Sequence, residues 1–129
     1  MASVAAKRQN ILVVEDDESL CKMIGKMLAP LGEVRTAGDG LEALRLVRGG
    51  FIPDVVVTDV MMPGMDGLAL AQRLKADRRT QRVPVVMLTA KDRAADVIDG
   101  INAGARHYIT KPFKHEDLVN KVKRLLGIK

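Results

Sequence analysis

The sequence predicts an α/β protein with a doubly wound, five-stranded parallel sheet in the order 2-1-3-4-5. Short apolar runs recur along the chain without polar alternation, as expected for strands covered on both faces. Between these runs the apolar residues follow a helical period, so strands and helices alternate, as in parallel sheets with right-handed crossovers. The 129 residues suit one domain, which we expect at residues 10–129 behind a flexible tail of residues 1–9.

Apolar, β-branched segments predict the strands at residues 11–14, 54–58, 83–88 and 107–109. A more polar segment, residues 33–37, predicts an edge strand. Five apolar stripes predict the helices, and Pro30, Gly49, Gly50, Gly104 and Gly127 lie where helices should stop. The stripes are Leu20, Met23, Ile24, Met27 and Leu28; Leu41, Leu44 and Val47; Leu68, Leu70, Ala71 and Leu74; Ala94, Val97, Ile98 and Ile101; and Leu118, Val119, Val122, Leu125 and Leu126.

Composition excludes several classes of protein. The net charge is +5, but Lys and Arg are interleaved with Asp and Glu, and Trp is absent, which argues against direct nucleic-acid contact. Cys21 is the only cysteine and falls in a helical stripe, so we expect a core thiol and a reducing compartment. The sequence has neither a signal peptide nor an apolar span long enough to cross a bilayer, which predicts a cytoplasmic protein without membrane contact.

The predicted strands end on polar residues that should meet at one edge of the sheet. Asp16 and Asp17 follow the first strand, Asp59 the third, Thr89 the fourth and Lys111 the fifth. In doubly wound sheets ligands bind at this edge. Taken singly, one of the first two acids is expected to cap a helix, Thr89 could be a cap, and Lys111 could be a surface amine. Capping explains one acid of that pair, and coincidence does not explain the whole set.

Crowded carboxylates indicate a divalent cation, and Mg²⁺ suits them because it takes one or two carboxylates and leaves room for phosphate oxygens. An aspartate beside such an ion can accept a phosphoryl group as an acyl phosphate. The oxygens of that group then need an ammonium and a hydroxyl, which Lys111 and Thr89 would supply.

The chain resembles the receiver domain of two-component response regulators, including the chemotaxis regulators, which has a flavodoxin-like fold. The resemblance covers residues 10–127 and consists of motifs in family order: ILVVEDDE, VTDVMMPGMDG, PVVMLTA, the Gly104-Ala105 pair and YITKPF. It implies that Asp59 is the phosphoacceptor and that Thr89 and Tyr108 form the switch pair. It also implies Mg²⁺ binding by Asp16, Asp17, Asp59 and the Met61 backbone carbonyl, a role for Lys111 at the phosphoryl group, and a cis bond before Pro112.

The resemblance implies a signalling switch and not a turnover enzyme. A histidine kinase or phosphotransfer protein would donate the phosphoryl group, and a protein target would bind the face of the fourth helix, fifth strand and fifth helix. That face offers Lys91, Arg93, Val97, Arg106, His107, Lys114 and Lys121, for which we expect an acidic or amphipathic partner. The chain would be a monomer or a phosphorylation-dependent dimer.

Three questions stay open at this stage. Neither Met61 nor Lys91, at positions that tune phosphate lifetime in the family, offers an acid or amide to orient water, so we expect slow autodephosphorylation. An aspartate-nucleophile hydrolase is the first alternative, although Met61 stands where it needs an acid. A degenerate receiver used only for binding is the second. The chain ends two residues after Gly127, which fits a single-domain regulator or a fragment of a longer protein.

Overall fold

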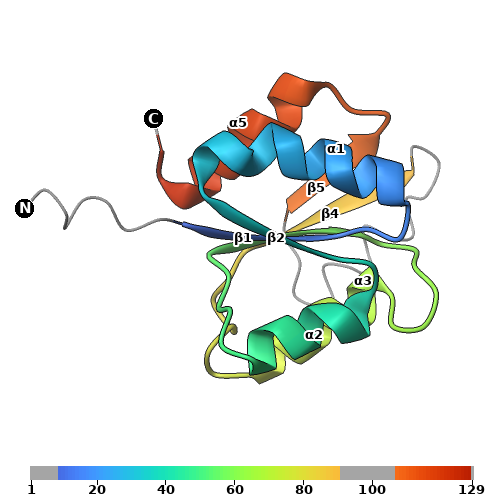
Figure 1. The fold of residues 1–129 in the computed structure, drawn as a ribbon, viewed down its shortest axis with the longest axis vertical. Coiled ribbons are helices and arrows are strands. Elements are labelled where there is room, and N and C mark those ends of the chain that lie inside the picture. Colours follow the sequence, from blue (N-terminus) through green and yellow to red (C-terminus); the bar gives the residue numbers. More distant parts are fainter. Residues whose placement is uncertain (1–8, 91–106, 129) are drawn as a thin grey trace, which may run out of the picture.

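The computed structural model describes residues 9–90 and 107–128. Its elements alternate along the chain as predicted (Figure 1). The strands are β1 (Asn10–Val14), β2 (Glu33–Ala37), β3 (Val55–Asp59), β4 (Val85–Ala90) and β5 (His107–Lys111). The helices are α1 (Glu18–Leu28), the 3-10 turn η2 (Ala29–Leu31), α2 (Gly40–Arg48), α3 (Gly67–Ala76) and α5 (His115–Leu126). The predicted fourth helix, with Ala94, Val97, Ile98 and Ile101, lies outside the described residues.

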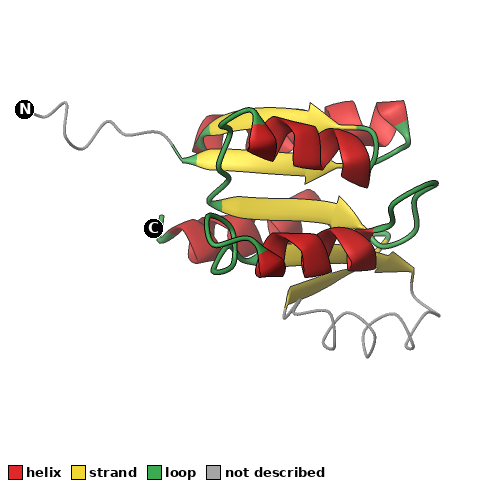
Figure 2. Cartoon of the chain, turned by 90° about the horizontal axis from the view of Figure 1, so that it is seen from below, coloured by secondary structure: helices red, strands yellow, loops and turns green. Residues whose placement is uncertain are grey.

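The five strands form one parallel sheet in the order β2-β1-β3-β4-β5, which confirms the predicted fold class. Helices α1 and α5 cover one face of the sheet, and α2 and α3 cover the other (Figure 1). Seen from below, the strands all point toward the same edge (Figure 2). The polar strand β2 lies at the side of the sheet, as its composition indicated.

The sheet divides the apolar core into two layers. Leu12, Val56 and Met87 face α2 and α3, whereas Ile11, Val57 and Leu88 face α1 and α5. All are almost fully buried, which explains why these strands lack polar alternation. Cys21 is buried in the second layer, as predicted.

Two residues of the predicted helical stripes lie outside the core. The side chain of Met23 is 46% exposed and that of Leu41 is 49% exposed, so their placement in the stripes was wrong. Leu41 is the second residue of α2, whereas Met23 lies in the middle of α1 and borders a surface pocket with Ala90 and Lys111. No helix among residues 9–90 and 107–128 has the length and apolarity needed to cross a bilayer.

Candidate functional site

The carboxyl ends of four strands bring the predicted site residues to one edge of the sheet. In the parallel register Thr58 pairs with Val14, Asp59 with Leu88, and Lys111 with Ala90. Asp59 and Lys111 are the last residues of β3 and β5, and Thr89 is the residue before the end of β4. The residues that carry chemistry therefore belong to the strand tips and to the loop after β1.

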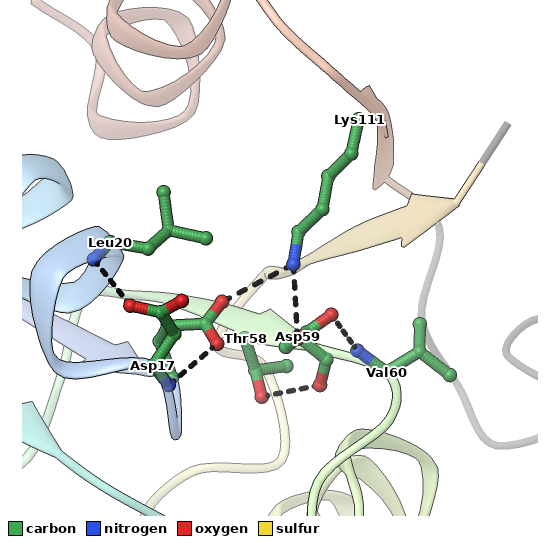
Figure 3. A network of polar contacts seen from close by, with 7 residues as sticks. Asp17, Leu20, Thr58, Asp59, Val60 and Lys111 are labelled. Carbon is green, nitrogen blue, oxygen red and sulfur yellow. Dashed lines mark hydrogen bonds and ion pairs between the residues drawn. The ribbon is translucent and has the colours of Figure 1, made fainter.

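Asp59 is held from two sides. Its Oδ1 accepts a hydrogen bond of 3.0 Å from the backbone N–H of Val60, and its Oδ2 lies 3.0 Å from the Lys111 ammonium (Figure 3). The side chain is 14% exposed, so the carboxylate is accessible from outside although it is mostly enclosed. A carboxylate in this position can react with a group that approaches the edge of the sheet.

Lys111 bridges two acids. Besides Asp59, its ammonium contacts Oε1 of Glu15 at 3.4 Å. Burial by itself lowers the pKa of Lys111, but the hydrogen bond and charge of Asp59, with a smaller contribution from Glu15, outweigh it and raise the pKa above its usual value. The ammonium therefore stays charged beside Asp59 at neutral pH.

Glu15 is the buried acid of the site. It follows β1, is 2% exposed, and its Oε2 accepts a hydrogen bond of 3.1 Å from the Asp17 backbone N–H. Burial raises the pKa of Glu15 to about 7; the Asp17 N–H and Lys111 lower it, while the charge of Asp59 and a hydrogen bond with Asp16 raise it. Such a raised pKa indicates an acid whose negative charge is incompletely compensated by the protein.

Three carboxylates gather here. Glu15, Asp16 and Asp59 each place one oxygen within 4.8 Å of the others, and Lys111 is the ammonium between two of them. Three acids against one ammonium leave an excess of negative charge, and hard oxygen ligands are those that Mg²⁺ prefers. The donor set and its charge therefore fit a divalent cation.

Asp17, which was also expected among the metal ligands, makes a capping hydrogen bond in the structure. Its Oδ1 accepts a hydrogen bond of 3.0 Å from the Leu20 backbone N–H and so caps the start of α1 (Figure 3). Glu15 lies beside Asp16 and Asp59. Sequence reasoning missed Glu15, although its position directly after β1, at the edge where the predicted site residues meet, was the available signal.

The remaining predicted residues are placed as follows. Thr89 is 3% exposed, and Tyr108 is half-buried against the core layer that contains Met87. Because side chains alternate along a strand, Thr89 lies on the same face of the sheet as Met87 and Tyr108. Met61 follows β3 with its side chain 56% exposed, and the peptide bond between Lys111 and Pro112 is cis.

Comparison with known proteins points to one family. A family model described as the response regulator receiver domain matches residues 11–123. The chain is 46% identical over 120 residues to the DNA-binding response regulator MtrA of Mycolicibacterium paratuberculosis, over 92% of this chain and 52% of MtrA. It is 41% identical over 120 residues to the response regulator PleD of Caulobacter vibrioides, over 92% of this chain and 26% of PleD. The chain thus spans about half the length of MtrA and about a quarter of PleD.

Solved structures agree. Chemotaxis response regulator CheY4 of Vibrio cholerae aligns with a TM-score of 0.84 and 31% identity, over 92% of this chain and 99% of that one. The BeF3-activated receiver domain of DrrB, a Thermotoga maritima protein, aligns with a TM-score of 0.83 and 34% identity, over 94% and 99% of the two chains. With the parallel sheet and the acidic edge already described, these matches show that the chain belongs to the response regulator receiver domain family of two-component signalling.

Proposed function

We propose that the chain is a phosphorylation-dependent switch in which Asp59 accepts a phosphoryl group from the phosphohistidine of a histidine kinase or phosphotransfer protein. The observation that carries the proposal is the position of the Asp59 carboxylate, held between the Lys111 ammonium and the Val60 N–H beside two further acids. In the transfer a carboxylate oxygen forms a bond to phosphorus while the bond from phosphorus to the donor imidazole breaks. The product is an acyl phosphate on Asp59.

The residues of the chain contribute orientation and charge. The Val60 N–H fixes one oxygen of Asp59, and the β3 strand fixes its backbone. The Lys111 ammonium lies 3.0 Å from Asp59 Oδ2. It is placed to pair with the carboxylate before the transfer and with the oxygens of the incoming phosphoryl group during it. Phosphoryl transfer depends mainly on such positioning, and the barrier falls because the reactants are held in line.

Mg²⁺ is the cofactor that we propose for the acidic edge. Asp16 and Asp59 would hold it, with Glu15 beside them. The Met61 carbonyl and Asp17 stay predicted ligands, although Oδ1 of Asp17 already caps α1. When bound, the ion would supply positive charge that neutralises phosphoryl oxygens. Lys111 and the ion would then together neutralise the negative charge of the carboxylates.

Thr89 and Tyr108 are the proposed switch. Phosphorylation replaces the single negative charge of the Asp59 carboxylate with an acyl phosphate that carries about two, and its oxygens should draw the Thr89 hydroxyl toward them. Tyr108 lies on the same face and is half-buried, so its ring can fill space that Thr89 vacates. The change would be read by a protein target on the face around β5 and α5, to which the predicted fourth helix would contribute.

The bounds of the domain and the lifetime of its phosphorylated state are also proposals. We assign the receiver domain to residues 10–129 and the tail to residues 1–9, and we expect slow autodephosphorylation because Met61 offers no group that orients water. A monomer or a phosphorylation-dependent dimer, and a cytoplasmic location, stay predictions. Should the natural protein be longer, as MtrA and PleD are, phosphorylation of the receiver domain would regulate the activity of its other domains.

The test is phosphorylation by a small donor. Incubation with Mg²⁺ and acetyl phosphate or phosphoramidate should add the mass of one phosphoryl group, measured on the intact protein, and Asp59→Asn should not gain it. Asp66→Asn is the matched control, because Asp66 caps α3 through Oδ1 and asparagine caps equally well. Steady release of phosphate would instead support a hydrolase, and an unchanged mass would support a binding module.

The fluorescence of Tyr108 can report the conformational change. The chain has one Tyr and no Trp, so its tyrosine fluorescence comes from Tyr108 alone. Phosphorylation should change this emission, and Thr89→Ala should accept the phosphoryl group while losing the change. Identical emission changes in Thr89→Ala and the original chain would refute the coupling of the two residues.

A further inference from the structure

A strongly basic segment lies at the opposite edge of the sheet from Asp59. Residues 73–82, which run from α3 toward β4, carry five Lys or Arg and one acid, Asp77. The strands β3 and β4 begin here, at Val55 and Val85, whereas the candidate phosphorylation site lies where the strands end. The proposed switch makes no use of these residues, so their charge calls for a separate explanation.

The segment borders a surface groove, which we call the arginine groove. The groove has a volume of about 410 Å³. Apolar residues from two connections line it: Ile52 and Pro53 before β3, and Val83 and Pro84 before β4. Arg78, Arg79 and Arg82, all exposed, provide its positive charge. The arginine groove is therefore amphipathic, with apolar side chains close to guanidinium groups.

Hydrogen bonds hold the basic segment in one shape. The buried Thr80 hydroxyl donates to the Leu74 carbonyl at 2.7 Å, and the Val83 N–H donates to the Thr80 carbonyl at 3.1 Å. The Lys75 ammonium donates to the carbonyls of Gln81 and Val83 at 3.1 and 3.2 Å. Because the backbone is already ordered, a ligand would not have to pay for ordering it.

The positive charge of the arginine groove is only partly neutralised. Arg79 pairs with Asp77 at 3.1 Å, and both side chains are exposed. Asp54, the acid that lines the groove, accepts a hydrogen bond of 2.7 Å from the Asn10 N–H. Within residues 9–90 and 107–128, Arg78 and Arg82 have no ion-pair partner. Two guanidinium groups thus remain available beside an apolar surface.

We propose that the arginine groove is a docking site for an acidic protein segment in which an apolar side chain is flanked by carboxylates. The planar guanidinium groups of Arg78 and Arg82 match carboxylates, and the apolar lining matches the side chain between them. A nucleic acid fits less well, because no aromatic residue lines the groove for base stacking. Docking at this edge leaves Asp59 open to its phosphoryl donor.

The test uses a fluorescein-labelled nonapeptide with two central leucines between runs of glutamate, measured by fluorescence anisotropy with the full chain. The peptide should bind, and Arg78→Glu/Arg82→Glu should weaken binding at least tenfold. Lys26→Glu/Arg124→Glu carries the same change of charge on exposed positions of α1 and α5 and should bind within twofold of the original chain. Amide chemical shifts should move at Ile52, Asp54 and residues 78–83.

Several outcomes would overturn the proposal. The first is that the original chain does not bind the peptide. The second is that both double variants lose peptide affinity to the same extent. The third is that a DNA duplex or anionic vesicles bind through the same arginines more tightly than the peptide does. A peptide with serine in place of the leucines should bind at least fivefold more weakly, and equal binding would show that charge alone acts. Asp59→Asn should bind the peptide normally, so failure here is distinguishable from failure of the phosphorylation switch.

Discussion

Lys111 is the residue on which the charge balance of the acidic edge depends. Its ammonium lies 3.0 Å from Asp59 and 3.4 Å from Glu15, two carboxylates that are 14% and 2% exposed. Removing it leaves mostly enclosed negative charges without a counter-charge, which is costly unless a metal ion or a proton compensates. Lys111 and a divalent cation are therefore expected to compete as well as to cooperate.

Replacing Lys111 with alanine should separate these two effects. The rate of phosphorylation from acetyl phosphate is expected to fall at least about tenfold, since the transferring group loses one ammonium. Affinity for Mg²⁺ should rise, because a positive charge next to the acids is gone. The rate is measured by intact mass spectrometry over time and the affinity by calorimetry.

Lys114→Ala serves as the control for Lys111→Ala. Lys114 is exposed, and its side chain makes no capping hydrogen bond at the start of α5. Its loss should leave both the rate and the affinity unchanged. Weaker Mg²⁺ binding in Lys111→Ala would contradict the charge balance described above.

Gly67 allows the chain to turn close to Asp59, the proposed phosphoacceptor. A Cβ atom at this position would meet the backbone carbonyl oxygen of Asp59, and the Gly67 N–H donates to the Val60 carbonyl at 2.9 Å. The backbone of Gly67 is therefore packed directly against the backbone of Asp59, which leaves no room for a methyl group.

Gly67→Ala should accordingly destabilise the protein by about 1–3 kcal/mol, the usual cost of overpacking. Urea unfolding monitored by circular dichroism measures this free energy. The variant should also be phosphorylated more slowly, because the Asp59 backbone has to shift. An unchanged free energy of unfolding would show that the turn absorbs the methyl group without strain.

At the scale of elements, three helices begin at an aspartate. Asp17, Asp39 and Asp66 each accept a hydrogen bond from the backbone N–H three residues later, at 2.8 to 3.0 Å. The sequence could indicate that one acid after β1 caps α1, but it could not say which one. That choice depends on the turn between β1 and α1, which places Asp16 with Glu15 and Asp59 and places Asp17 at the start of α1.

Substitutions at Asp16 and Asp17 should therefore have opposite signatures. Asp17→Ala is expected to lower the free energy of unfolding by about 1 kcal/mol, the typical value of a helix cap, with little effect on Mg²⁺ affinity. Asp16→Asn should lower Mg²⁺ affinity at least about tenfold and leave the stability of the metal-free protein nearly unchanged. Urea unfolding and calorimetry distinguish the two.

Asp17→Asn completes this comparison, because asparagine keeps the cap and removes the charge. Its stability should match that of the original chain. Should Asp17→Asn lose as much Mg²⁺ affinity as Asp16→Asn, Asp17 would be a ligand as the resemblance implied, and its role in α1 would be secondary.

Gly25 provides a test of helix α1 that is independent of the site. A Cβ atom there would lie 3.7 Å from Thr36 Cγ2 and 3.9 Å from Val34 Cγ1, which are ordinary contacts. Since glycine in a helix interior costs about 0.5–1 kcal/mol relative to alanine, Gly25→Ala should stabilise the protein by about that amount in urea unfolding. A loss of stability would mean that α1 cannot tolerate the added methyl group against β2.

At the scale of the whole molecule, the sequence was sufficient for the sheet but not for every detail of its edge. Continuous apolar strands and alternating helices allow few other topologies, so strand order and layers could be predicted. Met23 and Leu41 follow the helical period yet are exposed, because the period predicts the direction of a side chain and not whether the sheet extends far enough to cover it. Glu15 was missed for a related reason: its burial depends on the backbone continuing along β2 past the end of β1, where the Glu15 N–H donates to the Ala37 carbonyl at 3.0 Å.

The acidic edge also links metal binding to the stability of the entire domain. An ion that binds only the folded state stabilises it by an amount that grows with its concentration, about 2.7 kcal/mol at a hundredfold excess over the dissociation constant. The crowding of Glu15, Asp16 and Asp59 exists only when β1 and β3 are paired, so the unfolded chain has no equivalent site. Unfolding of the whole sheet should therefore depend on Mg²⁺.

Thermal unfolding in increasing Mg²⁺, at constant ionic strength maintained with NaCl, is expected to show a melting temperature that rises by several degrees, and chelation should reverse it. Asp16→Asn should lose most of the rise. Lys111→Ala should show a larger rise than the original chain, since the competing ammonium is absent. An equal rise in all three proteins would mean that Mg²⁺ acts elsewhere, and no rise in any of them would mean that the carboxylates are balanced without a metal.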